Sequence, residues 1–155
     1  VNFIMFLFFT LLSILIGRFL YRTELLQAGG MGYLLNAGMG GYYAQLDPAY
    51  AQELLPLLQN PWLLHVQRMV LHACVINLGL ALFNLLPIPP LDGFHVVNEV
   101  FFNGRIHMGG RNFQMMQSLF IILMLTTGFI GDFISNAIFT VQGFVLNGML
   151  RLFGL

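Results

Sequence analysis

The chain has 155 residues, of which 58% are hydrophobic and only 8% are charged, whereas soluble globular domains carry about 25% charged residues. It contains no lysine, and six arginines balance six acidic residues, so nothing indicates a nucleic-acid partner. A surface this poor in charge would not stay dispersed in water, and we therefore expect lipid to be the solvent for much of the chain.

The first predicted element is a transmembrane helix over residues 1–21. Residues 1–17 carry no charged side chain, and about 20 helical residues cross the ~30 Å hydrocarbon layer. Arg18 and Arg22 follow this run and provide an interfacial anchor. A signal peptide would carry its positive charge before the apolar run. Because the chain also begins with Val, we expect that residues upstream are missing.

Residues 23–61 form a more polar segment, which we expect to be a loop with a short helix. It begins with a glycine-rich stretch at residues 29–41. Asp47 and Pro48 then suit an N-cap and a first helical position, so we predict a short helix over residues 48–59, bent near Pro56. The pattern fits an interfacial helix and a partly re-entrant hairpin equally well.

A second transmembrane helix is predicted over residues 62–86. Pro87, Pro89 and Pro90 follow it and stop regular helix, because proline lacks an amide proton and clashes with the preceding turn. Asp92 and Gly93 can cap a further helix that runs to about residue 102.

Two more runs, uncharged over residues 112–131 and 133–150, predict helices over residues 112–131 and 133–153, with a break at Gly131 and Asp132. The chain shows no internal repeat and no hydrophilic linker. We therefore predict an all-α polytopic membrane protein, with residues 1–155 in a single membrane domain. It would contain about four transmembrane or membrane-embedded helices and a proline-broken segment that carries Asp92.

Asp92 is the strongest candidate functional residue. Irregular backbone at membrane depth persists only where protein buries it or where it lines a wet cavity. A carboxylate in that setting needs compensation by a metal ion, an arginine or a proton. Asn84 brings a neutral donor and acceptor to the same neighbourhood, and Gly93 allows a close approach to the backbone. The alternative is that Asp92 merely caps the following helix at the membrane surface.

The pattern Asn84-x-x-Pro87-x-Pro89-x-x-Asp92-Gly93 resembles the second signature of the site-2 protease family of intramembrane zinc metalloproteases. The resemblance implies that Asp92 is the third zinc ligand and that Asn84 lies near the active site, where it holds the substrate or the developing oxyanion. Pro87, Pro89 and Gly93 would shape the substrate-side loop. Zn²⁺ is the implied cofactor, and two histidines with one carboxylate leave an open position for water.

In that family the other two ligands are the histidines of a His-Glu-x-x-His helix, whose glutamate is the general base. No such motif occurs in these 155 residues. We therefore expect the chain to be the C-terminal part of the protease, inactive alone, with the missing segment of the same protein as its partner. The resemblance also implies a transmembrane protein substrate. We expect a multi-pass location in a lipid bilayer, that of a bacterial cell membrane.

Two other functions stay open. A non-catalytic relative would keep the fold and bind membrane partner proteins. A transporter or channel segment would use the broken helix and Asp92 as an ion site, although such a protein has no reason to show this Asn/Pro/Asp pattern.

Two histidines need separate interpretation. His95 lies one helical turn after Asp92 and could share a metal with it, but the resemblance does not assign it as a ligand. His72 lies inside the second predicted span and would face protein rather than lipid. We expect it to make a structural hydrogen bond, with Asn77 as the candidate partner.

Overall fold

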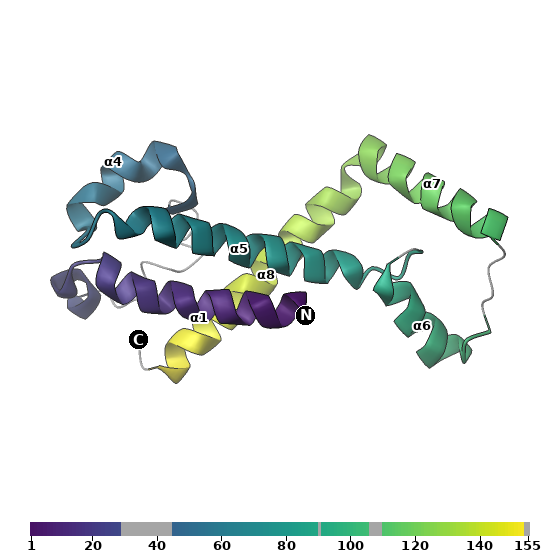
Figure 1. Cartoon of the computed structure of the whole chain (residues 1–155), viewed down its shortest axis with the longest axis horizontal. Helices are drawn as coiled ribbons and strands as arrows, with labels where there is room; N and C mark the ends of the chain where they lie inside the picture. Colours follow the sequence, from purple (N-terminus) through teal and green to yellow (C-terminus); the bar gives the residue numbers. More distant parts are fainter. Residues whose placement is uncertain (29–44, 90, 106–109, 154–155) are drawn as a thin grey trace. The chain divides into compact units, whose positions relative to one another are not determined.

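The computed structural model describes residues 1–28, 45–89, 91–105 and 110–153. These residues form helices and no strand. In chain order the elements are α1 (Asn2–Leu20), η2 (Pro48–Tyr50), α4 (Ala51–Leu54), η3 (Leu55–Leu57), α5 (Leu63–Asn84), α6 (Asp92–Phe102), α7 (Gly110–Thr127) and α8 (Phe129–Leu152) (Figure 1).

Among the described residues, three helices are long and apolar enough to cross a membrane by length and composition: α1, α5 and α8 from Ile130 onward. Together with the helical fold, they make this chain an all-α membrane protein. The fourth expected helix, α7, is not among the three found in the described part of the chain. Its first half is too polar, because it carries Arg111, Asn112 and Gln114.

The chain divides into two compact units. The first comprises residues 1–78 and 139–155, and the second comprises residues 79–138. The single membrane domain inferred from the sequence stays a prediction.

The core of the first unit forms where α1, α5 and α8 meet. Ile14, Leu71, Leu146 and Leu150 are buried together there. This burial is spread over three helices, as expected of helices that each have a limited protein-facing stripe.

A buried polar contact accompanies this core. The Gln67 side-chain amide on α5 donates to the backbone carbonyl of Ser13 and to the Gln45 side-chain carbonyl, each at 3.2 Å. Both protons of that amide are thereby satisfied, which offsets part of the cost of burying it, while the buried Gln67 Oε1 has no partner among the described residues. The contact links α5 to α1 and to the segment before η2.

The segment that contains η2, α4 and η3 is tied to the end of α1. The Asn60 side-chain amide donates to the Phe19 carbonyl at 2.7 Å, and the Gln59 amide donates to the Leu20 carbonyl at 2.8 Å. Arg68 on α5 secures the same segment, because its Nε donates to the Gln45 carbonyl at 2.7 Å. The bonds from Asn60 and Gln59 give the carbonyls at the end of α1 the partners that a helix terminus lacks.

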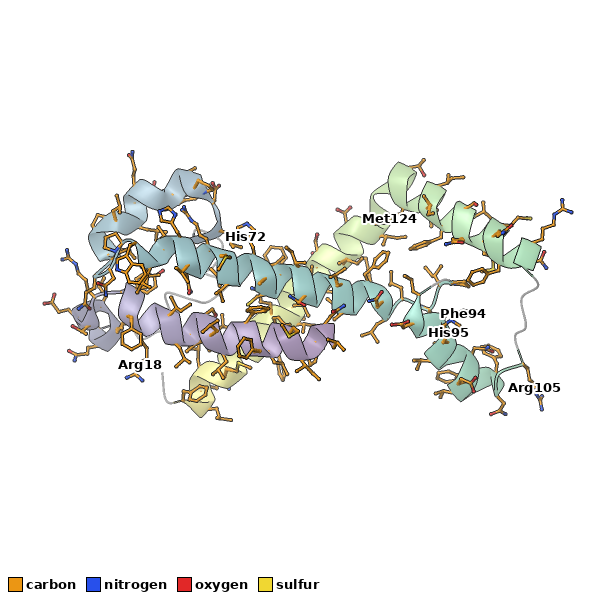
Figure 2. All side chains as sticks on the ribbon, in the orientation of Figure 1. Arg18, His72, Phe94, His95, Arg105 and Met124 are labelled. Atoms are coloured by element: carbon orange, nitrogen blue, oxygen red, sulfur yellow. The ribbon has the colours of Figure 1, made fainter. Side chains whose placement is uncertain are left out.

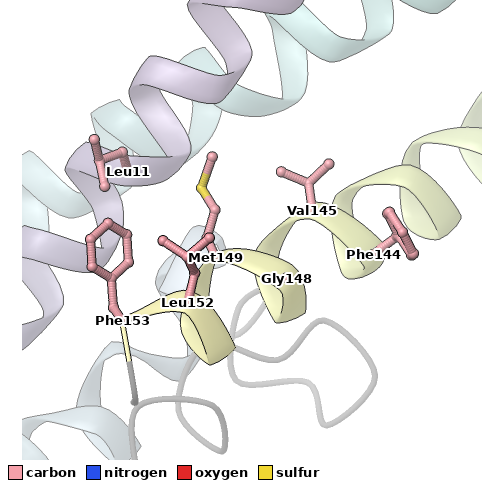
Figure 3. Close-up of a pocket in the computed structure, with 7 residues that line it drawn as sticks. All are labelled: Leu11, Phe144, Val145, Gly148, Met149, Leu152 and Phe153. Carbon is pink, nitrogen blue, oxygen red and sulfur yellow. The ribbon is translucent and has the colours of Figure 1, made fainter.

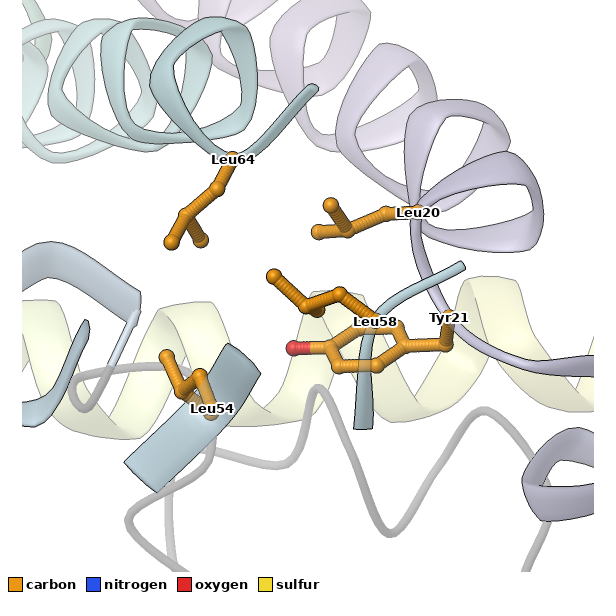
Figure 4. Packing of buried hydrophobic residues seen from close by; sticks show 5 residues of the cluster. All are labelled: Leu20, Tyr21, Leu54, Leu58 and Leu64. Carbon is orange, nitrogen blue, oxygen red and sulfur yellow. The ribbon is translucent and has the colours of Figure 1, made fainter. Parts of the chain in front are cut away.

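Apolar side chains fill the space under this segment. Figure 4 shows the cluster, which consists of Leu20, Tyr21, Leu54, Leu58 and Leu64. Burial raises the pKa of the Tyr21 phenol well above its ordinary value, because the charged form would lose its hydration. The phenol therefore stays neutral within the cluster.

The start of this segment matches the sequence prediction. The Asp47 carboxylate accepts a hydrogen bond from the Ala49 amide at 2.9 Å, as an N-cap residue does. The helix expected over residues 48–59 is instead three short pieces, since Pro56 lies within η3. The glycine-rich stretch at residues 29–41 lies outside the described residues, and the choice between interfacial helix and hairpin stays open.

The break between the last two helices differs from the prediction at Gly131 and Asp132. The break lies at Gly128, between the end of α7 at Thr127 and the start of α8 at Phe129. The φ of Gly128 is 62°, a left-handed conformation that interrupts the helix. Gly131 and Asp132 are instead in the first turn of α8, where an acidic side chain is favoured by the helix dipole.

Candidate metal and substrate site

The candidate site residues all lie in the second unit, at the loop between α5 and α6. α5 ends at Asn84 because Pro87 disfavours helical backbone in the residue before it and removes an amide donor. Short turns replace the helix. The Ile88 amide donates to the Leu86 carbonyl at 2.8 Å, and the Leu91 amide donates to the Ile88 carbonyl at 2.9 Å.

Apolar side chains between the prolines anchor this loop. Leu91 is buried together with Phe120 of α7 and Ile130 of α8, and Leu86 and Ile88 pack against them. The rings of Phe83 and Phe120 lie 6.0 Å apart. Pro87 faces outward and Pro89 is buried. These anchors were not predicted from the sequence, although the alternation of apolar residues with prolines was the available signal.

Gly93 brings the start of α6 against this loop. A Cβ added at Gly93 would overlap the Leu85 carbonyl and would lie 2.5 Å from the Leu86 carbonyl oxygen. The sequence predicted a close backbone approach at this glycine, and the approaching group is the protein's own chain. The contact fixes the start of α6 against the end of α5. Asn84 is the residue before Leu85 on one side of the contact, and Asp92 is the residue before Gly93 on the other side.

Asp92 is the first residue of α6. The N-cap position is occupied by Leu91, and no side chain caps this helix, so the expectation that Asp92 caps it is wrong. The Asp92 side chain is exposed. Within the described ranges its carboxylate makes no hydrogen bond or ion pair. It lies in the first turn of α6, and both oxygens are available to a ligand.

The other candidate residues lie around this point. Asn84 is half-buried at the last position of α5. His95 is exposed on α6, and its ring is 5.9 Å from that of Phe94 in an edge-on arrangement (Figure 2). The structure thus places a carboxylate, an amide and an imidazole near a turn with irregular backbone.

These residues do not make a complete zinc site. Catalytic zinc takes three protein ligands. Among residues 1–28, 45–89, 91–105 and 110–153, no group of three His, Cys, Asp or Glu side chains is placed to hold a metal ion. Asp92 fits the role of one ligand in a larger set, since its carboxylate is exposed and unpaired.

His72 and Asn77 do not bond to each other. The His72 Nδ1 lies 2.8 Å from the Arg68 carbonyl, and the Asn77 amide donates to the Ala73 carbonyl at 2.8 Å. Each side chain bonds to its own helix four residues back. The hydrogen bond expected of His72 therefore exists, but the expected partner is wrong. Residues five apart on a helix point to different faces and cannot meet.

Comparison with known proteins found a matching family model. The model of peptidase family M50 matches residues 50–127, which is half of the chain. The match includes α5, the proline loop, α6 and all of the candidate site residues. No curated protein and no solved structure matches. Peptidases of family M50 are generally zinc metalloproteases. This chain belongs to peptidase family M50, the site-2 protease family.

Proposed function

We propose that this chain is part of an intramembrane zinc metalloprotease that cuts transmembrane segments of substrate proteins, with Asp92 as its third zinc ligand. The observation that carries the proposal is the exposed, unpaired carboxylate of Asp92 at the start of α6. In a membrane protein such a group is costly unless a cation or a proton compensates it. Membership of a metalloprotease family favours the metal ion.

The proline loop supports the substrate part of the proposal. A helical substrate must unwind before its backbone can be cut, and it then needs polar partners at membrane depth. Asn84 offers an amide donor beside the loop, suited to hold a substrate carbonyl. The exposed side chains of Leu85 and Pro87 provide an apolar border to the same loop.

The remaining zinc ligands are assigned to a His-Glu-x-x-His segment of the same protein, which the 155 residues do not contain. On this account the metal is held jointly by that segment and Asp92. Zn²⁺ would supply a Lewis acid at the scissile peptide. The role of this chain is to place Asp92 and Asn84 through the contact at Gly93.

Cleavage of a membrane-inserted reporter by the full-length protein tests the proposal. We expect Asp92→Asn to lower the cleavage rate on the order of a hundredfold or more, because it removes a metal ligand. Asp132→Asn is the matched control, since Asp132 is also an exposed acid in the first turn of a helix. Wild-type cleavage by Asp92→Asn would contradict the proposal.

A further inference from the structure

An apolar cavity lies in the first unit, between α1 and the last turns of α8. Its volume is about 380 Å³, within the roughly 300–1,000 Å³ usual for ligand pockets. Figure 3 shows its lining, which consists of Leu11, Phe144, Val145, Gly148, Met149, Leu152 and Phe153. Six of the seven residues contribute an apolar side chain and the seventh is glycine, so the cavity suits a hydrocarbon ligand.

Its mouth is open to the surroundings of the protein. Phe144 and Leu152 are each 82% exposed, and a Cβ added at Gly148 would meet nothing within 4 Å. Because α1 and α8 are both apolar enough to cross a membrane, the surroundings at this depth are lipid chains. A hydrocarbon chain can therefore enter from the side without leaving the bilayer.

Two exposed arginines lie on the helices that line this cavity. Arg151 follows Phe144 and Gly148 at seven-residue and three-residue spacing, which places the three on one face of α8. Arg18 follows Leu11 by seven residues on α1, which is again the same face. Both arginine side chains are exposed, and neither has an ion-pair partner within the part of the chain that the structure describes.

The two arginines lie toward the same end of the cavity. Both helices run from right to left in Figure 1, and Figure 2 shows Arg18 at the left end of α1. Arg151 lies in the last turn of α8. Arg151 lies beside the lined part of α8, between the lining residues Met149 and Leu152, and Arg18 lies about two turns past Leu11 on α1. An apolar cavity with unpaired guanidinium groups beside it matches an anionic phospholipid, with a chain in the cavity and a phosphate at the arginines.

We propose that the cavity between α1 and α8 is a binding site for one anionic phospholipid, with an acyl chain against Gly148 and the headgroup at Arg151 and Arg18. The site lies in the first unit and the candidate zinc site in the second. It therefore depends neither on zinc nor on cleavage, and either proposal can fail without the other. A transmembrane helix of another protein would not require two cations at the rim.

The test uses the full-length protein, equilibrated with vesicles of equal phosphatidylglycerol and phosphatidylcholine and then extracted in mild detergent. Native mass spectrometry counts the lipids that each protein retains. We expect the wild type to retain one phosphatidylglycerol in preference to phosphatidylcholine. Gly148→Phe fills the cavity and should reduce retained lipid at least about tenfold, since each buried methylene contributes to binding.

Gly143→Phe is the matched control, because Gly143 is on the same helix, does not line the cavity and also has open space around it. It should retain lipid as the wild type does. Arg151→Gln leaves the cavity intact and should lower the preference for phosphatidylglycerol about fivefold, since a basic residue near the surface contributes roughly a factor of five. Arg111→Gln on α7 should leave that preference unchanged.

Several results would overturn the proposal. Equal retention of the two lipids by the wild type would show that the site does not select a charge. Unchanged lipid retention in Gly148→Phe would show that the cavity holds no chain. A wild-type dimer that Gly148→Phe converts to a monomer, with no change in lipid, would show that a second copy occupies the cavity. If Gly148→Phe does not fold, the exposed Arg151→Gln variant alone decides the outcome.

Discussion

Gly93 shows how one residue links the sequence pattern to the geometry of the site. Any side chain there would overlap the carbonyls of Leu85 and Leu86. Because Asp92 is the neighbouring residue, a shift of Gly93 away from the loop would also move the carboxylate. The Asp-Gly pair is therefore a single structural unit, in which glycine sets the position of the acid.

We expect Gly93→Ala to destabilise the protein by about 1–3 kcal/mol, the usual cost of overpacking a tight site. The thermal unfolding midpoint in detergent measures this effect. Gly110→Ala is the matched control, because Gly110 also begins a helix and has open space around it. Equal midpoints for the two variants would show that the contact at Gly93 does not constrain the fold.

The residue scale also shows what could be predicted from the sequence. Asn84, Pro87 and Asp92 stand out because prolines and an ionisable group are unusual in an apolar chain. The partners of His72 and Asn77 were not predictable from composition, because each side chain bonds to its own helix. The exact position of Asp92 relative to the cap depended on backbone geometry, which short-range patterns do not determine.

At the scale of elements, the apolar runs predicted the long helices well and their ends less well. The helix predicted over residues 62–86 begins at Leu63 and ends at Asn84. It ends before Pro87 because a proline disfavours helical backbone in the residue that precedes it. The helix predicted over residues 112–131 begins at Gly110 and ends at Thr127. The sequence prediction placed the break at Gly131 and Asp132, whereas the positive φ identifies Gly128 as the break.

Gly128 should resist substitution because its backbone is left-handed. With a φ of 62°, we expect Gly128→Ala to cost about 1–2 kcal/mol, the penalty of that conformation for an L-residue. Gly131→Ala, three residues later and within α8, should be neutral or stabilising by up to about 1 kcal/mol. Thermal unfolding of both variants makes the comparison. A more stable Gly128→Ala protein would place the break elsewhere.

At the scale of the whole molecule, the low content of charged residues indicates that lipid surrounds much of the chain. The motif around Asp92 predicts metal-dependent chemistry. Three helices suited to crossing a membrane surround the matched family region or lie within it. The burial pattern agrees with lipid as solvent, because large apolar side chains such as Phe144 and Leu152 remain exposed. The proposed zinc chemistry rests on the Asp92 carboxylate, and the described residues contain no group of three side chains that could hold a metal ion.

The zinc content of the full-length protein tests this account most directly. We expect one tightly held zinc per protein in the wild type and in the control Asp132→Asn. Asp92→Ala should lose most of its zinc, because one of three protein ligands is removed. Circular dichroism would verify that the variant remains helical. A folded Asp92→Ala protein with the zinc content of the wild type would contradict the assignment of Asp92 as a metal ligand.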